Sequence, residues 1–145
     1  MLSVRRTHEF AASAAHIWQF FGDFGSLASW WPKDGPVQID RVDVIGEGAG
    51  MLRNIYNVGM PDCISERLEA IDVEAQRLTL SIVGTLPAGL ISYRADAHLE
   101  ALGADRCQLT YVGSYTAEPG REQESEAFLV TVYTLMFAGL EGTLA

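Results

Sequence analysis

The C-terminal segment most constrains the fold, because a long helix is predicted from about Glu122 to Leu144, after the turn formed by Pro119 and Gly120. Its first turns are acidic, which suits the positive end of a helix dipole. Beyond Ala127 the segment is apolar almost all round, and a helix of that kind is buried on more than one side. The rest of the chain must therefore wrap around this helix.

The wrapping surface is predicted to be a sheet, because the segment 37–117 reads as strands with a period of two, joined by short connections. The predicted strands are 37–44, 51–58, 64–71, 77–83, 90–101 and 106–117. Short connections make antiparallel pairs, since parallel pairs need long crossovers. A change of parity at Asp40–Arg41 predicts a bulge in the first of these strands.

The N-terminal part adds a strand over Val4–Ala11 and two short helices. The first helix is predicted over Ala14–Phe21 with Ser13 as its cap, and the second ends before Pro32. The order of elements predicts one α+β domain over residues 1–145. Its expected form is a curved antiparallel sheet of about six to seven strands wrapped around the C-terminal helix, with two short helices after the first strand.

The charge balance narrows the class of partner. The chain has 145 residues, with 19 Asp and Glu against 10 Lys and Arg, which gives a formal net charge of −9. That charge argues against nucleic acid and against an anionic membrane surface. The apolar stretch 127–140 is too short to cross a bilayer, so no membrane insertion is expected. Cys63 and Cys107 are expected to be free thiols of a reducing compartment, which predicts a cytoplasmic protein.

Motifs for metals and nucleotides are missing. His8, His16 and His98 are scattered without metal-ligand spacing, so we expect no metal site. The glycine-rich segment 46–50 joins two strands and does not open a helix, so it is a turn rather than a dinucleotide loop. We expect no cofactor.

Glu66 is the most informative single residue. It shares a strand face with Ile64, Leu68 and Ala70, where an acid is costly unless it is paired, protonated or facing an aqueous cavity. Two interpretations remain open at this point. Glu66 either belongs to a pocket, or it is a glutamate at the rim of the sheet or a member of a structural salt bridge.

Tyrosines gather on the same inward faces. Parity places Tyr93 inside together with Ile91, and it places Tyr111, Gly113 and Tyr115 on one face of the next strand. Tyrosine combines an apolar ring with one polar group, which suits a cavity that orients a mostly apolar ligand. The alternative is a packed core in which the hydroxyl groups reach the backbone.

The C-terminal helix is expected to contribute to both the core and the cavity. Phe128, Val132, Leu135 and Gly139 form one helical stripe, which we expect to face the sheet. The expected cavity-lining side chains of this helix are Tyr133, Met136 and Phe137. Small residues at facing positions leave either close backbone approach or empty volume, and the sequence does not separate the two.

Several segments resemble a known superfamily. The segment 48–53 resembles the Gly-x-Gly-x-x-Arg entry into a strand of the polyketide cyclase/dehydrase group, within the START/Bet v 1-like superfamily. The segments 65–69, 80–84, 92–94 and 113–115 are similar to the plant abscisic acid receptors of the same superfamily. The resemblance implies a helix-grip fold around a ligand cavity, with Arg53 at its wall.

The receptor resemblance also implies site residues. Met60 and Pro61 match the receptors' gate loop, Glu66 their pocket glutamate and Tyr93 their pocket tyrosine, while Lys33 lies about where their carboxylate-binding lysine is found. Two departures argue against abscisic acid and against the receptors' phosphatase partner. The latch is replaced by the segment 86–89, beginning at Leu86, and Gly113 replaces an acidic residue.

Three functions follow as hypotheses. The leading one is a binding protein for a small, largely apolar molecule, whether lipid-like, aromatic or polyketide-like. The second is an enzyme of the cyclase/dehydratase type, with Glu66 and a tyrosine such as Tyr93 transferring protons. The third is a protein-interaction module with a collapsed cavity. The adjacent Trp30 and Trp31 leave core packing, a lid and a homodimer contact open.

Overall fold

The structure is a computed structural model that describes residues 1–144, and its main element is one antiparallel sheet. The strands are β1 (Leu2–Phe10), β2 (Ile39–Ile45), β3 (Leu52–Asn57), β4 (Ile64–Asp72), β5 (Arg77–Val83), β6 (Leu90–Gly103) and β7 (Arg106–Ala117). The helices are α1 (Ala14–Phe21), α2 (Leu27–Trp30) and α3 (Glu122–Gly142), with a 3₁₀ turn over Phe24–Ser26 before α2.

The strand order is β1-β7-β6-β5-β4-β3-β2, so β1 joins the sheet beside the last strand. All of these pairs are antiparallel, as the short connections predict. The register between β2 and β3 shifts between Ile39 and Arg41, which confirms the predicted bulge.

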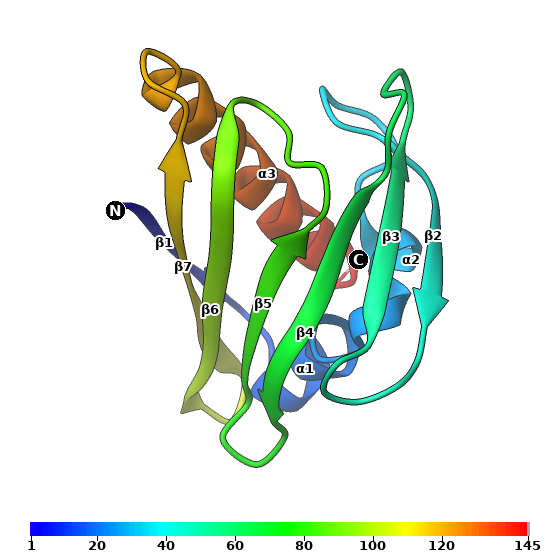
Figure 1. Cartoon of the computed structure of the whole chain (residues 1–145). Coiled ribbons are helices and arrows are strands. Elements are labelled where there is room, and N and C mark those ends of the chain that lie inside the picture. The colour runs from blue at the N-terminus through cyan, green and yellow to red at the C-terminus, as the bar shows by residue number, and fades with distance from the viewer. Residues whose placement is uncertain (145) are drawn as a thin grey trace.

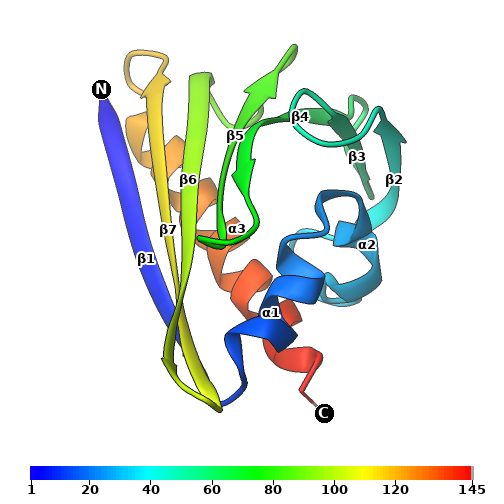
Figure 2. The same ribbon diagram turned by 90° about the horizontal axis from the view of Figure 1, so that it is seen from below.

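The sheet curves around α3, which lies along its concave side (Figures 1 and 2). In the view from below, α2 lies beside β2, and α1 lies close to the C-terminal half of α3 (Figure 2). The predicted α+β helix-grip arrangement is therefore confirmed. The long helix packs against the sheet and the two short helices, while an outer side that includes Ala127, Thr134 and Ala138 is exposed, so it is less enclosed than its apolar character predicts.

The short helices close one end of this arrangement. Ser13 caps α1, since its side chain accepts a hydrogen bond of 3.1 Å from the backbone N–H of His16. Trp30 and Trp31 are both buried, with 7% and 6% of their surface exposed. Trp31 donates from Nε1 to the carbonyl of Val37 at 2.9 Å. Of the three interpretations of these tryptophans, packing inside the protein is the one observed.

Two bulges correct the predicted strand faces. The register between β4 and β5 shifts between Leu68 and Ala70, and Ala70 is exposed instead of inward. The register between β6 and β7 shifts between Leu90 and Ser92, so Leu90 is buried while Ile91 is 56% exposed. A single extra residue reverses the parity of every side chain on one side of it, and simple alternation misses this.

The buried side of α3 also differs from the predicted stripe. Its buried residues are Ser125, Leu129, Tyr133, Met136, Phe137, Gly139 and Leu140. Gly139 of the expected stripe is among them, whereas Phe128, Val132 and Leu135 are only half-buried, so the most buried side is rotated in part from the expected one. The reason is that a helix with apolar residues on all sides carries little information about which side is innermost.

None of the helices within residues 1–144 combines the length and the apolar character that crossing a membrane requires. Cys63 is half-buried and Cys107 is buried, and both are free thiols.

Candidate functional site

A cavity lies between α3, the short helices and the inner faces of β2 to β7. Its volume is about 80 Å³, enough for several water molecules. Its lining residues are Phe21, Phe24, Leu27, Trp30, Trp31, Val37, Ile39, Arg53, Ile55, Asn57, Ile64, Glu66, Leu78, Leu80, Ile82, Tyr93, Tyr111, Phe128, Leu129, Val132, Tyr133 and Met136. Pockets for drug-sized ligands measure about 300–1,000 Å³, so a ligand of that size would require side chains to move.

The structure brings together half of the residues named from the sequence. The ones that line the cavity are Arg53, Glu66, Tyr93, Tyr111, Tyr133 and Met136. The ones that lie outside its lining are Lys33, Met60, Pro61, Leu86, Tyr115 and Phe137.

The outlying residues have other environments. Lys33 is exposed and donates from Nζ to the carbonyl of Ala28 at 3.1 Å. Tyr115 is buried in the core, and Phe137 stacks on the ring of His8 with the ring centroids 5.2 Å apart. Lys33 follows α2 in a segment without regular structure, where spacing in the sequence does not determine the direction of a side chain.

Arg53 and Glu66 form a buried ion pair at the cavity wall. They are register partners on β3 and β4, and 10% and 13% of their side chains are exposed. Both Nε and Nη2 of Arg53 lie 2.7 Å from Oε1 of Glu66, and Nη1 donates to the carbonyl of Phe24 at 3.0 Å. The guanidinium carbon also lies 3.9 Å from the ring centroid of Phe24. Glu66 thus combines both interpretations, since it lines the cavity and forms a salt bridge.

Three tyrosines meet at another part of the cavity wall. The hydroxyl oxygens of Tyr93 on β6 and Tyr133 on α3 are 2.5 Å apart and share a hydrogen bond. The ring of Tyr111 on β7 packs edge-on against that of Tyr133, with the centroids 4.7 Å apart. Gly113 makes this possible, because a β-carbon there would collide with the Tyr133 hydroxyl.

The tyrosines are held in their neutral form. Burial raises the pKa of Tyr93 and of Tyr111 well above the ordinary tyrosine value, and it also raises the pKa of Tyr133. The negative charge of Glu66 adds to the rise for each of them, most clearly for Tyr111. At neutral pH the cluster therefore offers hydroxyl donors and acceptors, but no charge.

Sequence reasoning missed Asn57 and the aromatic end of the cavity. Asn57 follows Arg53 and Ile55 on the inward face of β3, and only 7% of its surface is exposed. Its parity with Arg53 on one predicted strand is the sequence signal that could have identified it. Trp30 and Trp31 line the same cavity, and a pair of tryptophans carries no parity signal that places both inside.

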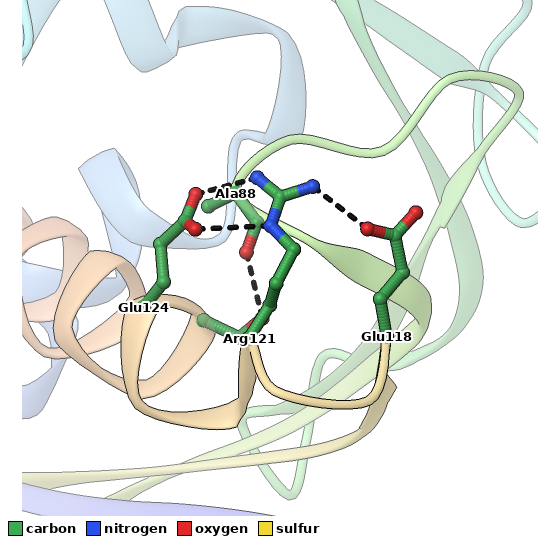
Figure 3. A network of polar contacts seen from close by, with 5 residues as sticks. Ala88, Glu118, Arg121 and Glu124 are labelled. Carbon is green, nitrogen blue, oxygen red and sulfur yellow. Dashed lines mark hydrogen bonds and ion pairs between the residues drawn. The ribbon is translucent and has the colours of Figure 1, made fainter.

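The loop that follows β5 is fastened to the start of α3. Buried Ser125 donates from Oγ to the carbonyl of Ala88 at 2.7 Å. The backbone N–H of Glu118 donates to the carbonyl of Gly89 at 2.9 Å. Arg121 lies between Glu118 and Glu124 and bonds both carboxylates, at 2.8 Å and 2.6 Å for the shortest contacts (Figure 3). The end of the segment 86–89 is thus hydrogen-bonded to α3 and to the residues just before it.

Solved structures with the same fold are numerous. An uncharacterised protein from Bacillus thuringiensis has a TM-score of 0.83 at 21% identity, over 99% of this chain and 100% of that one. Norcoclaurine synthase from Thalictrum flavum, solved with dopamine and hydroxybenzaldehyde, has a TM-score of 0.79 at 21% identity, over 99% of this chain and 85% of that one. The di-domain ARO/CYC protein BexL has a TM-score of 0.80 at 17% identity, over 99% of this chain and 46% of that one.

At these identities the structures show a shared fold. Among curated proteins, no sequence matches the chain. A family model does match, over residues 1–144, and its description is polyketide cyclase/dehydrase and lipid transport. Because that match spans nearly the whole chain, and the fold agrees with it, the chain belongs to the polyketide cyclase/dehydrase and lipid transport family.

Proposed function

We propose that the chain binds a small, largely apolar molecule, whether lipid-like, aromatic or polyketide-like, in the cavity between the sheet and α3. The observation that carries this proposal is the composition of the cavity wall. Aliphatic and aromatic side chains form most of it, and the polar groups are few: a neutralised ion pair, three phenols, one amide and two indole N–H groups. Apolar walls with few convergent polar groups are typical of small-molecule sites.

The comparisons support the same proposal. The family description includes lipid transport, and one structure with this fold was solved with dopamine and hydroxybenzaldehyde, both small aromatic molecules. The space left among the lining side chains favours a ligand over an interaction module with a collapsed cavity.

The proposed setting is one cytoplasmic domain over residues 1–145. Unpaired Cys63 and Cys107 support a reducing compartment. A net charge of −9 supports a small molecule rather than nucleic acid as the partner. The proposal includes no homodimer contact through Trp30 or Trp31, because both are buried.

Two experiments test the binding proposal. Native mass spectrometry of freshly purified protein should reveal a co-purifying small molecule. Titration of ¹⁵N-labelled protein with toluene should shift the amide resonances of cavity residues and should be saturable. Val132→Trp, which fills the cavity from α3, should abolish these shifts. Val130→Trp is the matched control, because Val130 is half-buried on the same helix outside the cavity lining.

The proposal fails if toluene shifts no cavity resonance in the parent protein. It also fails if Val132→Trp binds toluene as the parent does while Val130→Trp remains folded.

One observation favours a second candidate, an enzyme of the cyclase/dehydratase type. Only Oε1 of Glu66 is bonded to Arg53, and Oε2 has no hydrogen bond to another described residue. A carboxylate oxygen that lines the same cavity as three phenols is an arrangement that can move protons through a bound molecule. The molecule recovered by mass spectrometry would be incubated with protein and followed for a change of mass. For an enzyme, Glu66→Gln should reduce turnover by about 10²–10⁴-fold while leaving toluene binding intact.

A further inference from the structure

The inner face of β3 presents a polar, an apolar and a second polar side chain to the cavity. Arg53, Ile55 and Asn57 are all buried and all line it. Positions 53 and 57 are four residues apart on one strand, which separates them by about 13 Å. The cavity therefore has two polar regions on this strand, with apolar wall between them.

The charge at the first region is already neutralised. Nε and Nη2 of Arg53 both bind Glu66, and its Nη1 binds the carbonyl of Phe24. Arg53 and Glu66 are the charged residues among the described lining, and Lys33 lies outside it. An anionic ligand would enter this apolar space without a counter-charge, which is strongly unfavourable.

The second region is a buried amide that is free to bind. Asn57 lines the cavity, and only 7% of its surface is exposed. Its side chain has no hydrogen bond to any other residue among residues 1–144. Asn54, on the other face of the same strand, does accept a hydrogen bond, of 2.7 Å, from Ser65. An asparagine side chain offers two donors and an acceptor. The amide atoms of Asn57 keep some exposed surface at the cavity, whereas Nε1 of Trp30, in the same lining, is the fully buried side-chain donor without a partner among residues 1–144.

We infer that Asn57 is the polar anchor of the cavity, and that it selects an uncharged ligand with an adjacent donor and acceptor, such as a carboxamide or a lactam. This inference rests on the binding function proposed above. The ligand's apolar body would lie along Ile55 and Ile64 toward the tyrosines. A carboxamide can exchange two hydrogen bonds with the Asn57 side chain, whereas a carboxylate can only accept.

The test compares three single-ring probes by titration of ¹⁵N-labelled protein. They are toluene, 4-methylbenzamide and 4-methylbenzoate. The three share a methyl-substituted ring and differ only at the position para to the methyl group, which carries hydrogen, a carboxamide or a carboxylate. In the parent protein, 4-methylbenzamide should bind at least tenfold more tightly than 4-methylbenzoate. It should also shift the side-chain NH₂ resonances of Asn57, and leave those of Asn54 unchanged.

Two variants distinguish the contribution of Asn57 to binding from that of the rest of the cavity. Asn57→Leu should weaken 4-methylbenzamide about tenfold and keep toluene within about twofold, because Leu removes the amide at similar size. Asn54→Leu is the matched control and should leave all three probes unchanged. Since the amide of Asn57 lacks a protein partner, Asn57→Leu should unfold at the same or a higher urea concentration than the parent.

Outcomes that overturn the inference are distinct from those that overturn the binding function. Equal binding of 4-methylbenzoate and 4-methylbenzamide overturns it, as does an Asn57→Leu variant that retains the preference. Unmoved NH₂ resonances of Asn57 in the saturated parent overturn it without any variant. Failure of toluene to bind overturns the proposed function itself.

Discussion

The hydroxyl group of Tyr133 occupies the space beside Gly113 that the β-carbon of any other residue would need. The ring of Tyr93 is also close, with Cε1 3.0 Å and the hydroxyl oxygen 3.2 Å from that β-carbon position. Gly113 on β7 therefore allows a tyrosine of α3 to reach across the strand and meet a tyrosine of β6. The hydrogen bond between Tyr93 and Tyr133 therefore depends on the lack of a side chain at Gly113.

Gly113→Ala should displace the Tyr133 hydroxyl and lower the free energy of unfolding by about 1–3 kcal/mol, the range for overpacking a core. Urea denaturation measures this. In the double variant Gly113→Ala/Tyr133→Phe the collision is relieved, so its loss should be smaller than the sum of the single losses. Gly103→Ala is the control, since a β-carbon there meets open space. A Gly113→Ala variant as stable as the parent would contradict this account.

Stability should fall in alkali because of the buried tyrosines. Burial raises the pKa of Tyr93, Tyr111 and Tyr133, so above about pH 10 the unfolded chain loses phenol protons that the folded protein keeps. Their contribution is complete below that pH and is lost as the pH rises. Three such groups lower the free energy of unfolding by up to about 4 kcal/mol per pH unit.

Urea unfolding between pH 9 and pH 12 measures this slope. Tyr133→Phe should reduce it by about a third. If all tyrosine absorbance changes with pH occur in the folded protein, before the loss of near-ultraviolet circular dichroism, the buried hydroxyls are not held neutral by the fold.

Removing Glu66 should destabilise the protein strongly. Glu66→Ala leaves Arg53 buried without a counter-charge, which costs about 3–5 kcal/mol. Replacing both partners, as in Arg53→Met/Glu66→Leu, should recover most of that loss, because an apolar pair of similar size has no unpaired charge. The surface pair Arg67–Glu69 provides the comparison, and Glu69→Ala should have a much smaller effect. Equal effects of the two single variants on thermal unfolding would refute the burial argument.

The hydroxyl group of Ser125 should control the opening of the loop that it binds. Ser125→Ala removes the bond to the Ala88 carbonyl and should destabilise the protein by about 1 kcal/mol. Amide exchange of residues 84–90 should accelerate, while exchange in β3 remains unchanged. Thr134→Val is the control, because the Thr134 hydroxyl binds only the Val130 carbonyl within α3. Unchanged loop exchange in Ser125→Ala would show that other contacts hold the loop.

The sequence predicted the architecture because its two strongest signals are periodic. A helix apolar on all sides needs a wrapping partner, and alternating strands with short connections provide an antiparallel one. The same alternation failed beyond the bulges at Leu68/Ala70 and Leu90/Ser92, since one extra residue reverses the faces and leaves no mark in the residue types.

The cavity was predicted in part for a related reason. Glu66, Tyr93 and Tyr111 are polar residues on apolar faces, so strand parity identifies them. Lys33 was placed by spacing alone, and spacing does not determine the direction of a side chain in a turn. The partnership of Arg53 with Glu66 depends on the register between β3 and β4, which is a property of the assembled sheet.

The two hydroxyls of Tyr93 and Tyr133 carry two hydrogens between them, and their mutual bond uses one. The pair can therefore direct a single hydrogen toward a third group, from whichever tyrosine accepts the mutual bond. Rotation of the two O–H bonds reverses that bond while every heavy atom stays in place. A molecule whose acceptor lies beside β6 and one whose acceptor lies beside α3 can thus be met by the same pair, so the cavity can serve alternative binding orientations without repacking.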